Sequence, residues 1–585
     1  MLLAAAVALG PFALGAAIRH AAGKRGLIAR FDRPQLTVAF GARIRDLRLI
    51  RVSSGDTLLA ADSLELRLSP LRLLVLQLAP AGVRLTHARI ELPAPRESGQ
   101  DSLGEEETGS KRNARPDRSG RLRALADQLV RALLLPARTL PSLELRDVHV
   151  RRASADDTLE VDIERLALSA KSAGAALAAK GRLGAAGAVP FAGRLHYGRD
   201  DRLTGAFRFE LPDPGGSRAW PLEFGVDGRV TQDRRAGRIE IREPTTLRVG
   251  RIAMRLAATL DRRGPALDLR LAADSLTESR LKASLPPPVL GPLEEVGARG
   301  GWDYRLRFQL DLARPDSVEF AAGVIPHGLS LDPDRTRLNL LTLDQPFVAT
   351  IHLPHRRLVT RDLSPANPHF RALDRIDSTL AHAVVTNEDG GFFRHRGFNP
   401  EAIRNSIAEN IRAAAYRRGA GTITMQVARN LWLGHDRTLA RKAQEVILAW
   451  VLEHLTGVSK QRLLEIYLNV IEWGPDVHGA DEAARYFLGH DAGRMSVDEA
   501  LFLTTVIPSP LKWRWRFEKD GSLRQFEREQ MHFIGRAMIA RGWLAPEALP
   551  PVEALRVELR GPAREVIFPP AADSVGAGQA GRPAS

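Results

Sequence analysis

The sequence has no cysteine among its 585 residues, and this absence excludes disulfide bonds and thiol catalysis. Aromatic residues are sparse, at 6% of the chain. Acidic residues are outnumbered, with 69 Asp and Glu against 84 Lys and Arg, which gives a formal net charge of +15. This excess predicts an anionic partner, such as an acidic membrane surface or a phosphorylated substrate. Zinc-ligand spacings, RNA-binding strand motifs and long basic helices are missing, so nucleic acid is not expected as a partner.

Long hydrophobic runs are missing except near the start, where Leu2–Ile18 consists of apolar and small residues. The run is close to the lower length limit for a helix that spans a bilayer. A membrane anchor, the core of a signal peptide and a buried helix all fit it, although Gly10 and Pro11 disfavour a buried helix. We predict an anchor over residues 1–25, with the bulk of the protein outside the cytoplasm. Arg19, which follows the run, favours the opposite orientation under the positive-inside rule.

Residues 26–347 alternate apolar and polar side chains in short runs, as in Ser63–Leu68 and Tyr304–Leu312. This period of two predicts antiparallel strands with one buried and one wet face, joined by turns rich in Gly, Pro and Asp. Residues 96–120 are polar and charged and predict a disordered insertion. The hydrophobic start, the strands and phrases such as Gly82–Leu85 resemble AsmA-type envelope proteins, which implies a groove that accommodates lipid. An ordinary β-sandwich or spacer is the alternative.

The last third of the chain changes to helical spacing. Asp377 or Ser378 is placed to cap one helix, and Ser459 is placed to cap a later one. We therefore predict a mainly α domain over residues 348–545. The remainder, 546–585, is rich in Pro, Ala and Gly and predicts a flexible tail.

Two carboxylates lie among these helices. Glu388 ends an apolar helix beside Asp389, a place that raises a carboxyl pKa and suits a general acid or base near neutral pH. A Glu-Asp pair taken alone is more often a solvated surface pair. Glu445 falls within a helix predicted over Leu439–Leu455, where Arg441 lies one turn earlier and is placed to pair with it. Apolar neighbours on the same side predict that Glu445 points inward.

Four ordered motifs carry a second family resemblance. They are Glu388-Asp389-x-x-Phe392-x-x-His395-x-Gly397, Gly419-x-Gly421-Thr422-Ile423-Thr424-x-Gln426 continuing to Arg429-Asn430, Arg441-Lys442-x-x-Glu445, and Ser459-Lys460 followed by Tyr467-Leu468-Asn469. Together they resemble the glycosyltransferase family 51 domain, the peptidoglycan polymerase of penicillin-binding proteins and monofunctional transglycosylases. The resemblance implies a lysozyme-like α fold. It also implies polymerisation of lipid II into glycan strands, with inversion and release of undecaprenyl pyrophosphate.

The same resemblance implies roles for individual residues. Glu388 and Glu445 are the catalytic pair. Glu388 removes the proton from the acceptor hydroxyl, and Glu445 positions cations or binds a divalent cation such as Mg or Mn, although the sequence requires no cofactor. His395 takes either a supporting hydrogen-bonding role or a structural one. The implied substrate-binding residues are Asp389, Phe392, His395, Thr422, Thr424, Gln426, Arg429, Asn430, Arg437, Arg441 and Lys442, with Arg429 and Arg437 facing the leaving pyrophosphate.

The chain departs from the family pattern at three positions. Gly421 stands where serine is usual, Met425 where glutamine is frequent, and Arg429 where lysine is usual. An envelope lipid-binding or transport protein with a weakened transferase domain is therefore one alternative, and a peptidoglycan hydrolase is another. No Lys-Thr-Gly triplet occurs and few residues follow the α domain. We therefore expect no transpeptidase activity.

The expected partners are lipid II, the growing glycan chain, the membrane and cell-wall synthesis proteins. The expected location is the bacterial inner membrane, with the catalytic domain on the periplasmic side. One further feature is Lys512–Phe517, which alternates cations and aromatic rings. This pattern suits a lipid headgroup boundary. Packing of Trp513 and Trp515 against the domain is the alternative.

Overall fold

The computed structural model describes residues 2–568 apart from 38–40, 69–79, 93–141, 154–157, 172–173, 185–188, 199, 214–217, 234, 262–263, 265, 355–356, 414–418 and 436–437. The predicted insertion at 96–120 lies outside the described residues. The chain forms two compact units. The first comprises Met1–Leu290, Gly300–Gly328 and Ile403–Arg418, and the second Gly291–Arg299, Leu329–Ala402 and Gly419–Ser585.

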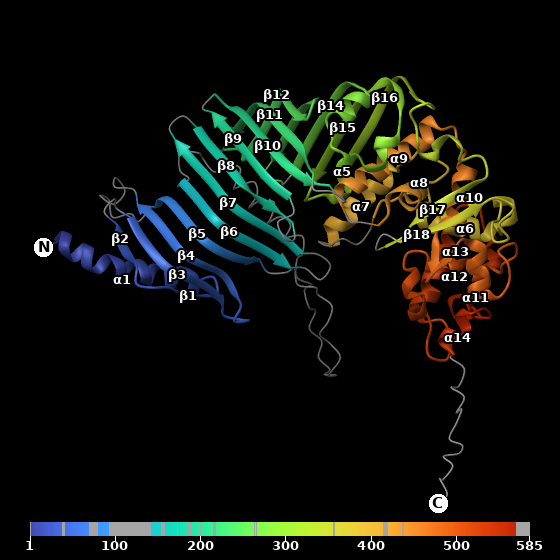
Figure 1. Ribbon diagram of the computed structural model, residues 1–585. Coiled ribbons are helices and arrows are strands. Elements are labelled where there is room, and N and C mark those ends of the chain that lie inside the picture. Colours follow the sequence, from blue (N-terminus) through green and yellow to red (C-terminus); the bar gives the residue numbers. More distant parts are fainter. Residues whose placement is uncertain are drawn as a thin grey trace, which may run out of the picture. The chain divides into compact units, whose positions relative to one another are not determined.

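The first unit is built on a 16-stranded sheet whose strands follow one another in chain order (Figure 1), with the short β2 paired to β3. The strands are β1 (Leu27–Arg30), β2 (Gln35–Thr37), β3 (Gly41–Arg51), β4 (Thr57–Leu68), β5 (Pro80–Leu92), β6 (Ser142–Ala153), β7 (Thr158–Lys171), β8 (Gly174–Leu183), β9 (Val189–Gly198), β10 (Arg202–Pro212), β11 (Ala219–Asp233), β12 (Arg238–Val249), β13 (Ile252–Asp261), β14 (Ala266–Leu276), β15 (Ala298–Asp311) and β16 (Glu319–Leu331). The runs predicted at Ser63–Leu68 and Tyr304–Leu312 fall in β4 and β15, so the period of two was a sound indicator of strands.

The predicted antiparallel pairing is wrong at one place. Strands β5 and β6 are parallel, with Val83 opposite Leu143 and Leu85 opposite Leu145. Parallel neighbours need a crossover connection, because the second strand must begin at the same end as the first. Residues 93–141 connect these strands and lie outside the described part.

The two faces of the sheet differ in chemistry. One small buried cluster comprises Ala61, Leu85, Ala88 and Val148. On another row, the register aligns Arg43, Glu65, Arg84 and Glu144 across β3 to β6. Glu65 accepts ion pairs from Arg43 at 2.7 Å and from Arg84 at 3.0 Å, and Arg84 also lies 2.7 Å from Glu144. Alternation along each strand thus separates apolar packing from cross-strand charge pairs.

Helix α1 (Leu2–Gly23) occupies the predicted anchor and contacts β1 and β2. The Arg33 guanidinium lies 4.4 Å from the centroid of the Phe12 ring, and that of Arg19 lies 5.2 Å from the Phe31 ring. Among the helices in the described ranges, none combines the length and apolarity that crossing a bilayer requires. The anchor therefore stays a prediction.

The second unit is mainly helical, as predicted. Its helices are α6 (Ser378–Asp389), α8 (Ile423–Ala428), α9 (Leu439–Leu455), α10 (Lys460–Val470), α11 (Ala480–Leu488), α12 (Val497–Val506), α13 (Gln525–Ala540) and α14 (Ala563–Ile567). Short turns of helix are η2 (Gly291–Glu295), η4 (Asn339–Leu341), η6 (Leu373–Arg375), η7 (Arg429–Leu433), η8 (Pro510–Arg516), η9 (Pro546–Ala548) and η10 (Val552–Ala554). Two hairpins pair β17 (Phe347–His352) with β18 (Leu358–Leu363), and β19 (Glu472–Gly474) with β20 (Val477–His478).

The other helices are α4 (Glu278–Lys282) and α5 (Pro287–Leu290) in the first unit, and α7 (Pro400–Ala413), which is divided between the units. A further turn, η3 (Pro315–Ser317), precedes β16. Local sequence explains the helix starts. Asp377 caps α6 by accepting a hydrogen bond of 2.8 Å from the Thr379 amide, and Ser459 caps α10 by accepting from Arg462.

The predicted domain boundaries need correction at both ends. Leu343 is fully buried in the second unit, and its carbonyl accepts a hydrogen bond of 2.6 Å from Arg462. The unit therefore begins well before residue 348. At the other end, the predicted flexible tail includes packed structure, because Leu555 and Ala563 are at most 1% exposed. The compact unit extends at least through α14.

Candidate active site

Glu388 lies in the last turn of α6, whose inner face buries Leu380, Ala383 and Val384. The residue as a whole is half-buried. Burial raises the pKa of Glu388, and hydrogen bonds from neighbouring amides only partly offset this effect. The helix thus holds a carboxylate at the edge of an apolar core, where it keeps some solvent access and becomes a stronger base.

Gln426 fixes this carboxylate. The Gln426 Nε2 atom donates to Glu388 Oε2 at 2.9 Å, and Asn387 Nδ2 donates to Oε1 at 3.0 Å. The Gln426 Oε1 atom accepts from the Tyr467 hydroxyl and from Arg429 Nη2, each at 3.3 Å. Because two donors meet the Gln426 Oε1 atom, the Gln426 side-chain amide must turn its NH2 group toward Glu388. The orientation of the candidate base therefore depends on α6, α8, η7 and α10 together.

Asp389 is a positioning residue and does not reach the surface. Its side chain is 3% exposed and accepts from His395 Nε2 at 2.9 Å. Its Oδ2 atom also accepts from the Ile423 backbone amide at 3.1 Å, at the first residue of α8. Asp389 therefore ties the end of α6 to the start of the helix that carries Gln426. The contact of His395 with Asp389 is compatible with both roles that the sequence left open.

A second buried group supports the same helices. Thr422 caps α8 by accepting from the Met425 amide, and its hydroxyl donates to the Gly397 carbonyl at 2.7 Å. Thr424 donates to Glu453, and Lys460 Nζ lies 2.8 Å from that carboxylate. Burial lowers the pKa of Lys460, against the effect of Glu453. These contacts are internal and fix the helices behind Glu388.

A cationic cluster lies on the first turns of α9. Glu445 is 2% exposed, and its two oxygens are paired with Arg441 and with Lys442, the latter at 2.8 Å. The inward orientation predicted for Glu445 is therefore correct. The Lys442 side chain remains 48% exposed. Glu445 thus holds two cations in place, and one of them, Lys442, is also exposed at the surface, where an anionic ligand can reach it.

This arrangement does not fit a divalent cation at Glu445. Both carboxylate oxygens already accept from positively charged groups, which would repel a metal ion. In the part of the chain that the structure describes, no three His, Asp or Glu side chains gather as a metal site. No step is therefore assigned to a metal at Glu445.

Residues 429–433 form one turn of π-helix, η7, immediately after α8. Such turns are uncommon and often occur at functional sites, because they re-aim the side chains that they carry. Here the turn carries Arg429 and the buried Asn430. The Arg429 Nε atom is buried and has no hydrogen-bond partner among the described residues. Arg429 therefore keeps donor capacity beyond its bond to Gln426.

His435 was not found from the sequence. Burial lowers its pKa to about 4, and the charges of Arg429 and Arg441 act in the same direction. The imidazole is therefore neutral at physiological pH. Its electrostatic neighbours show that Arg429, on η7, and Arg441, on α9, face a common region. No motif in the sequence singled out this histidine.

Residues near the start of the second unit also support the site. Trp432 of η7 donates to Asn339 Oδ1 at 3.1 Å, and β17 contacts η7. Gly291 has a positive φ of 52° and lies against Gln444 of α9, where an added Cβ would come within 2.8 Å of the amide. Both η7 and α9, which carry the cations, are thus contacted by residues of Gly291–Arg299 and Leu329–Ala402 in the same unit.

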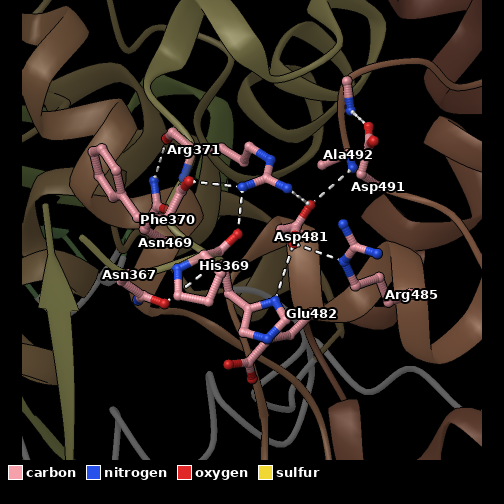
Figure 2. A network of polar contacts seen from close by, with 12 residues as sticks. Asn367, His369, Phe370, Arg371, Asn469, Asp481, Glu482, Arg485, Asp491 and Ala492 are labelled. Carbon is pink, nitrogen blue, oxygen red and sulfur yellow. Dashed lines mark hydrogen bonds and ion pairs between the residues drawn. The ribbon is translucent and has the colours of Figure 1, made fainter. Parts of the chain in front are cut away.

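The helix that carries Tyr467 is anchored by a separate polar network (Figure 2). The Asp481 carboxylate is fully buried and accepts from Arg371 at 2.9 Å, from Arg485 at 3.0 Å and from His369 at 3.1 Å. Asn469 of α10 exchanges hydrogen bonds of 3.0 and 2.8 Å with the Arg371 backbone. The network fixes α10, and with it the Tyr467 hydroxyl, against α11.

The predicted site residues thus separate into groups. Glu388, Gln426 and Arg429 form one network, and Arg441, Lys442 and Glu445 form another. Phe392, Thr422, Thr424 and Asn430 are at most 4% exposed and face the interior. Their proposed contact with substrate stays a prediction. Arg437 lies outside the described residues.

Residues 357–535 match the family described as Transglycosylase. The chain is similar to the biosynthetic peptidoglycan transglycosylases of Pseudomonas aeruginosa (44% identical over 144 residues, 25% of this chain and 61% of the relative) and Bordetella pertussis (43% over 141 residues, 23% and 57%). The enzyme of that name from Acinetobacter baylyi is 34% identical over 167 residues, which cover 27% of this chain and 74% of the relative. The chain spans about three fifths of the first two relatives.

Proposed function

Because the chain belongs to the transglycosylase family, we propose that it is a peptidoglycan glycosyltransferase. In this proposal it polymerises lipid II into glycan strands, with inversion at the anomeric carbon and release of undecaprenyl pyrophosphate. The observation that carries the proposal is the Glu388 carboxylate, whose pKa is raised by burial and whose orientation is fixed by Gln426.

Glu388 acts as the general base. It accepts the proton of the acceptor sugar hydroxyl while that oxygen attacks the anomeric carbon of the donor. The bond from this carbon to the phosphate oxygen breaks, and the pyrophosphate leaves with the electron pair. Attack from the face opposite the leaving group inverts the linkage. A base with a raised pKa is better matched to a hydroxyl proton than an ordinary carboxylate is.

The cations stabilise the leaving group. The Arg429 guanidinium and the exposed Lys442 supply donors to the pyrophosphate as its negative charge grows. Glu445 takes no proton in this scheme. Its ion pairs with Arg441 and Lys442 hold α9 cations in a fixed geometry before substrate arrives. Arg437 is proposed as a further pyrophosphate contact.

We place the protein in the bacterial inner membrane with the second unit on the periplasmic side, since lipid II is polymerised there. Cell-wall synthesis proteins are the proposed partners, beside lipid II, the glycan product and the membrane. A periplasm-specific reporter fused after Ser585 tests this topology. Activity of a cytoplasm-specific reporter at the same position would contradict both the location and the function.

Incubation of the purified full chain with labelled lipid II tests the reaction. The proposal predicts glycan strands longer than the substrate disaccharide, together with undecaprenyl pyrophosphate. The same protein should leave added, preformed glycan strands intact. Shortening of those strands without polymer formation would favour the hydrolase alternative.

A lipid-binding function of the sheet is the second candidate, and one observation favours it. The sheet has a hollow of about 760 Å³ over β7 to β12. Most of its lining residues are small or apolar, and the polar positions are Ser169, Arg194, His196, Thr204, Asp227 and Arg248. Replacing Ala178 in this hollow with Trp should then reduce capture of a fluorescent phospholipid and leave polymerisation unchanged. Equal capture by the variant and the wild type would remove the support.

A further inference from the structure

The segment Lys512–Phe517 splits into inward and outward side chains. Trp513 is 1% exposed. Its ring lies edge-on to Phe487 at 5.2 Å and to Tyr486 at 6.1 Å between centroids. The packing alternative is therefore correct for Trp513, which is a core residue. Trp515, two positions later, is 67% exposed.

A buried ion pair holds the same segment from the other end. Arg516 Nη1 lies 2.6 Å from the Glu527 carboxylate, which is fully buried on α13. The Arg516 Nη2 atom also donates to the Thr505 carbonyl of α12. With Trp513 and Arg516 both fixed in the core, η8 is a rigid platform. This backbone position keeps the outward side chains of η8 at the surface.

The outward side chains are apolar residues and cations. We call Leu511, Lys512, Arg514 and Trp515 the η8 surface. Leu511 is 60% exposed, and Lys512 Nζ lies 5.2 Å from the Trp515 ring centroid. Arg514 donates to the Val566 carbonyl at 3.3 Å. Within the described ranges, neither cation of the η8 surface lies within ion-pair distance of a carboxylate.

We propose that the η8 surface docks on an anionic lipid bilayer. A tryptophan ring and a leucine side chain enter the headgroup boundary favourably, and lysine and arginine stems reach along it to lipid phosphates. Pro508–Phe517 contains no acid, and of its three cations Arg516 is paired with Glu527, so Lys512 and Arg514 supply the charge that complements an anionic surface. This docking does not depend on the proposed reaction, because it rests on the exposed side chains alone.

The absence of cysteine permits a test at single residues in the full chain. Leu511→Cys is labelled with an environment-sensitive fluorophore and mixed with vesicles of equal parts phosphatidylglycerol and phosphatidylcholine. Phe533→Cys on α13 is the matched control, because Phe533 is 67% exposed, close to the 60% of Leu511, and lies beside Glu529. Ser509→Cys supplies a second label position if the first variant does not fold. The label's fluorescence is read only from protein that is bound to vesicles. Membrane binding through other parts of the chain therefore does not decide whether the label at residue 511 enters the bilayer.

The proposal predicts a blue shift of the label at residue 511, and none at residue 533. Lys512→Glu with Arg514→Glu should weaken this response, because each cation near an anionic surface changes partitioning by about fivefold. A label at residue 511 that stays in water on bound protein would overturn the proposal. An equal response with phosphatidylcholine alone, or at residue 533, would also overturn it. A shift that needs no vesicles and grows with protein concentration would instead assign the surface to a second copy of the chain.

Discussion

The two units of this protein treat charge in opposite ways. In the first unit, acids and arginines pair across neighbouring strands at the surface, as Glu65 does with Arg43 and Arg84. In the second unit, carboxylates enter the core. Among the described residues, every buried carboxylate belongs to the second unit, namely Asp332, Asp389, Glu445, Glu453, Asp481 and Glu527.

The difference shows where function is built. A surface pair contributes little free energy, so a sheet with many pairs gains mainly solubility and strand register. A buried carboxylate costs desolvation energy, so it persists only where several donors fix it. Asp389, Glu453 and Glu527 each hold neighbouring helices in one arrangement. The half-buried Glu388 lies among these fixed points and retains access to solvent.

The largest expected effect comes from a variant that removes the proposed base and leaves the fold intact. Glu388→Gln keeps the shape of the side chain and its hydrogen-bonding capacity but accepts no proton. Polymerisation of lipid II should fall by about 10²–10⁴-fold, while binding of lipid II stays close to that of the wild type. Steady-state rates and equilibrium binding, measured at fixed salt, give the two quantities.

Stability provides the control for this variant. Burial raises the pKa of Glu388, so the folded chain holds this proton more tightly than the unfolded chain does. The resulting stabilisation is fully present below the unfolded pKa, near 4.3, and is lost as the pH rises through the folded pKa. Above that pH, Glu388→Gln should be at least as stable as the wild type. A less stable variant would mean that lost activity reflects a damaged fold.

The next prediction compares a buried carboxylate of the second unit with a carboxylate that is paired on the sheet. Asp481→Ala removes the centre of a buried network and should destabilise the second unit by about 3–5 kcal/mol. Glu65→Ala removes a partner from the sheet row and should cost below about 1 kcal/mol. Hydrogen exchange followed by mass spectrometry measures each unit separately. Equal losses in the two variants would contradict the distinction drawn between the units.

Arg429 bonds to Gln426 beside the base and is proposed to face the pyrophosphate, so its removal should affect substrate binding as well as turnover. Arg429→Ala removes a charged donor worth about 1.5–3 kcal/mol and should raise KM for lipid II by roughly tenfold to a hundredfold. Arg429→Lys keeps the charge and loses the planar fork, so its KM should be intermediate. An unchanged KM in the alanine variant would exclude contact with the pyrophosphate.

The smallest effect concerns the missing serine. A Cβ added at Gly421 would meet only Lys442 Nζ, at 3.9 Å, so Gly421→Ser should change stability by less than about 0.5 kcal/mol. Gly479→Ala is the contrasting variant. Its φ is +89°, and an added Cβ would lie 2.8 Å from the Asn469 carbonyl, so it should cost about 1–3 kcal/mol. Thermal unfolding compares them, and similar melting temperatures would contradict the open space at Gly421.

Local patterns in the sequence gave much of this architecture. Alternation predicted strands such as β4, and the helix predicted over Leu439–Leu455 has the bounds of α9. The four motifs located Glu388 and the α9 cations, because those residues lie at fixed spacings within single helices. The sequence also marked Ser459 as a cap, since a cap depends on the residues immediately after it.

Features that depend on tertiary contacts were out of reach. The parallel pairing of β5 with β6 depends on a long connection, and the neutral His435 depends on cations from two elements. The motif residues Thr422 and Thr424 were predicted as substrate contacts, and the structure shows that they are buried. The sequence alone does not distinguish a hydroxyl that caps a helix from one that meets a ligand. Residues 329–346 were predicted to belong to the β region, and tertiary bonds such as those of Arg462 with the Leu343 carbonyl and of Trp432 with Asn339 reveal their place in the second unit.

The central claim is that Glu388, with its raised pKa and its fixed orientation, is the base, and the pH profile of kcat/KM for lipid II tests this most directly. The rate should fall on the acid side with an apparent pKa above the ordinary glutamate value of about 4.3. Gln426→Leu removes a hydrogen bond that favours the charged carboxylate, so this acid limb should move to higher pH. Glu388→Gln should abolish the limb in the activity that remains. An acid limb that stays at the same pH in both variants would contradict the account.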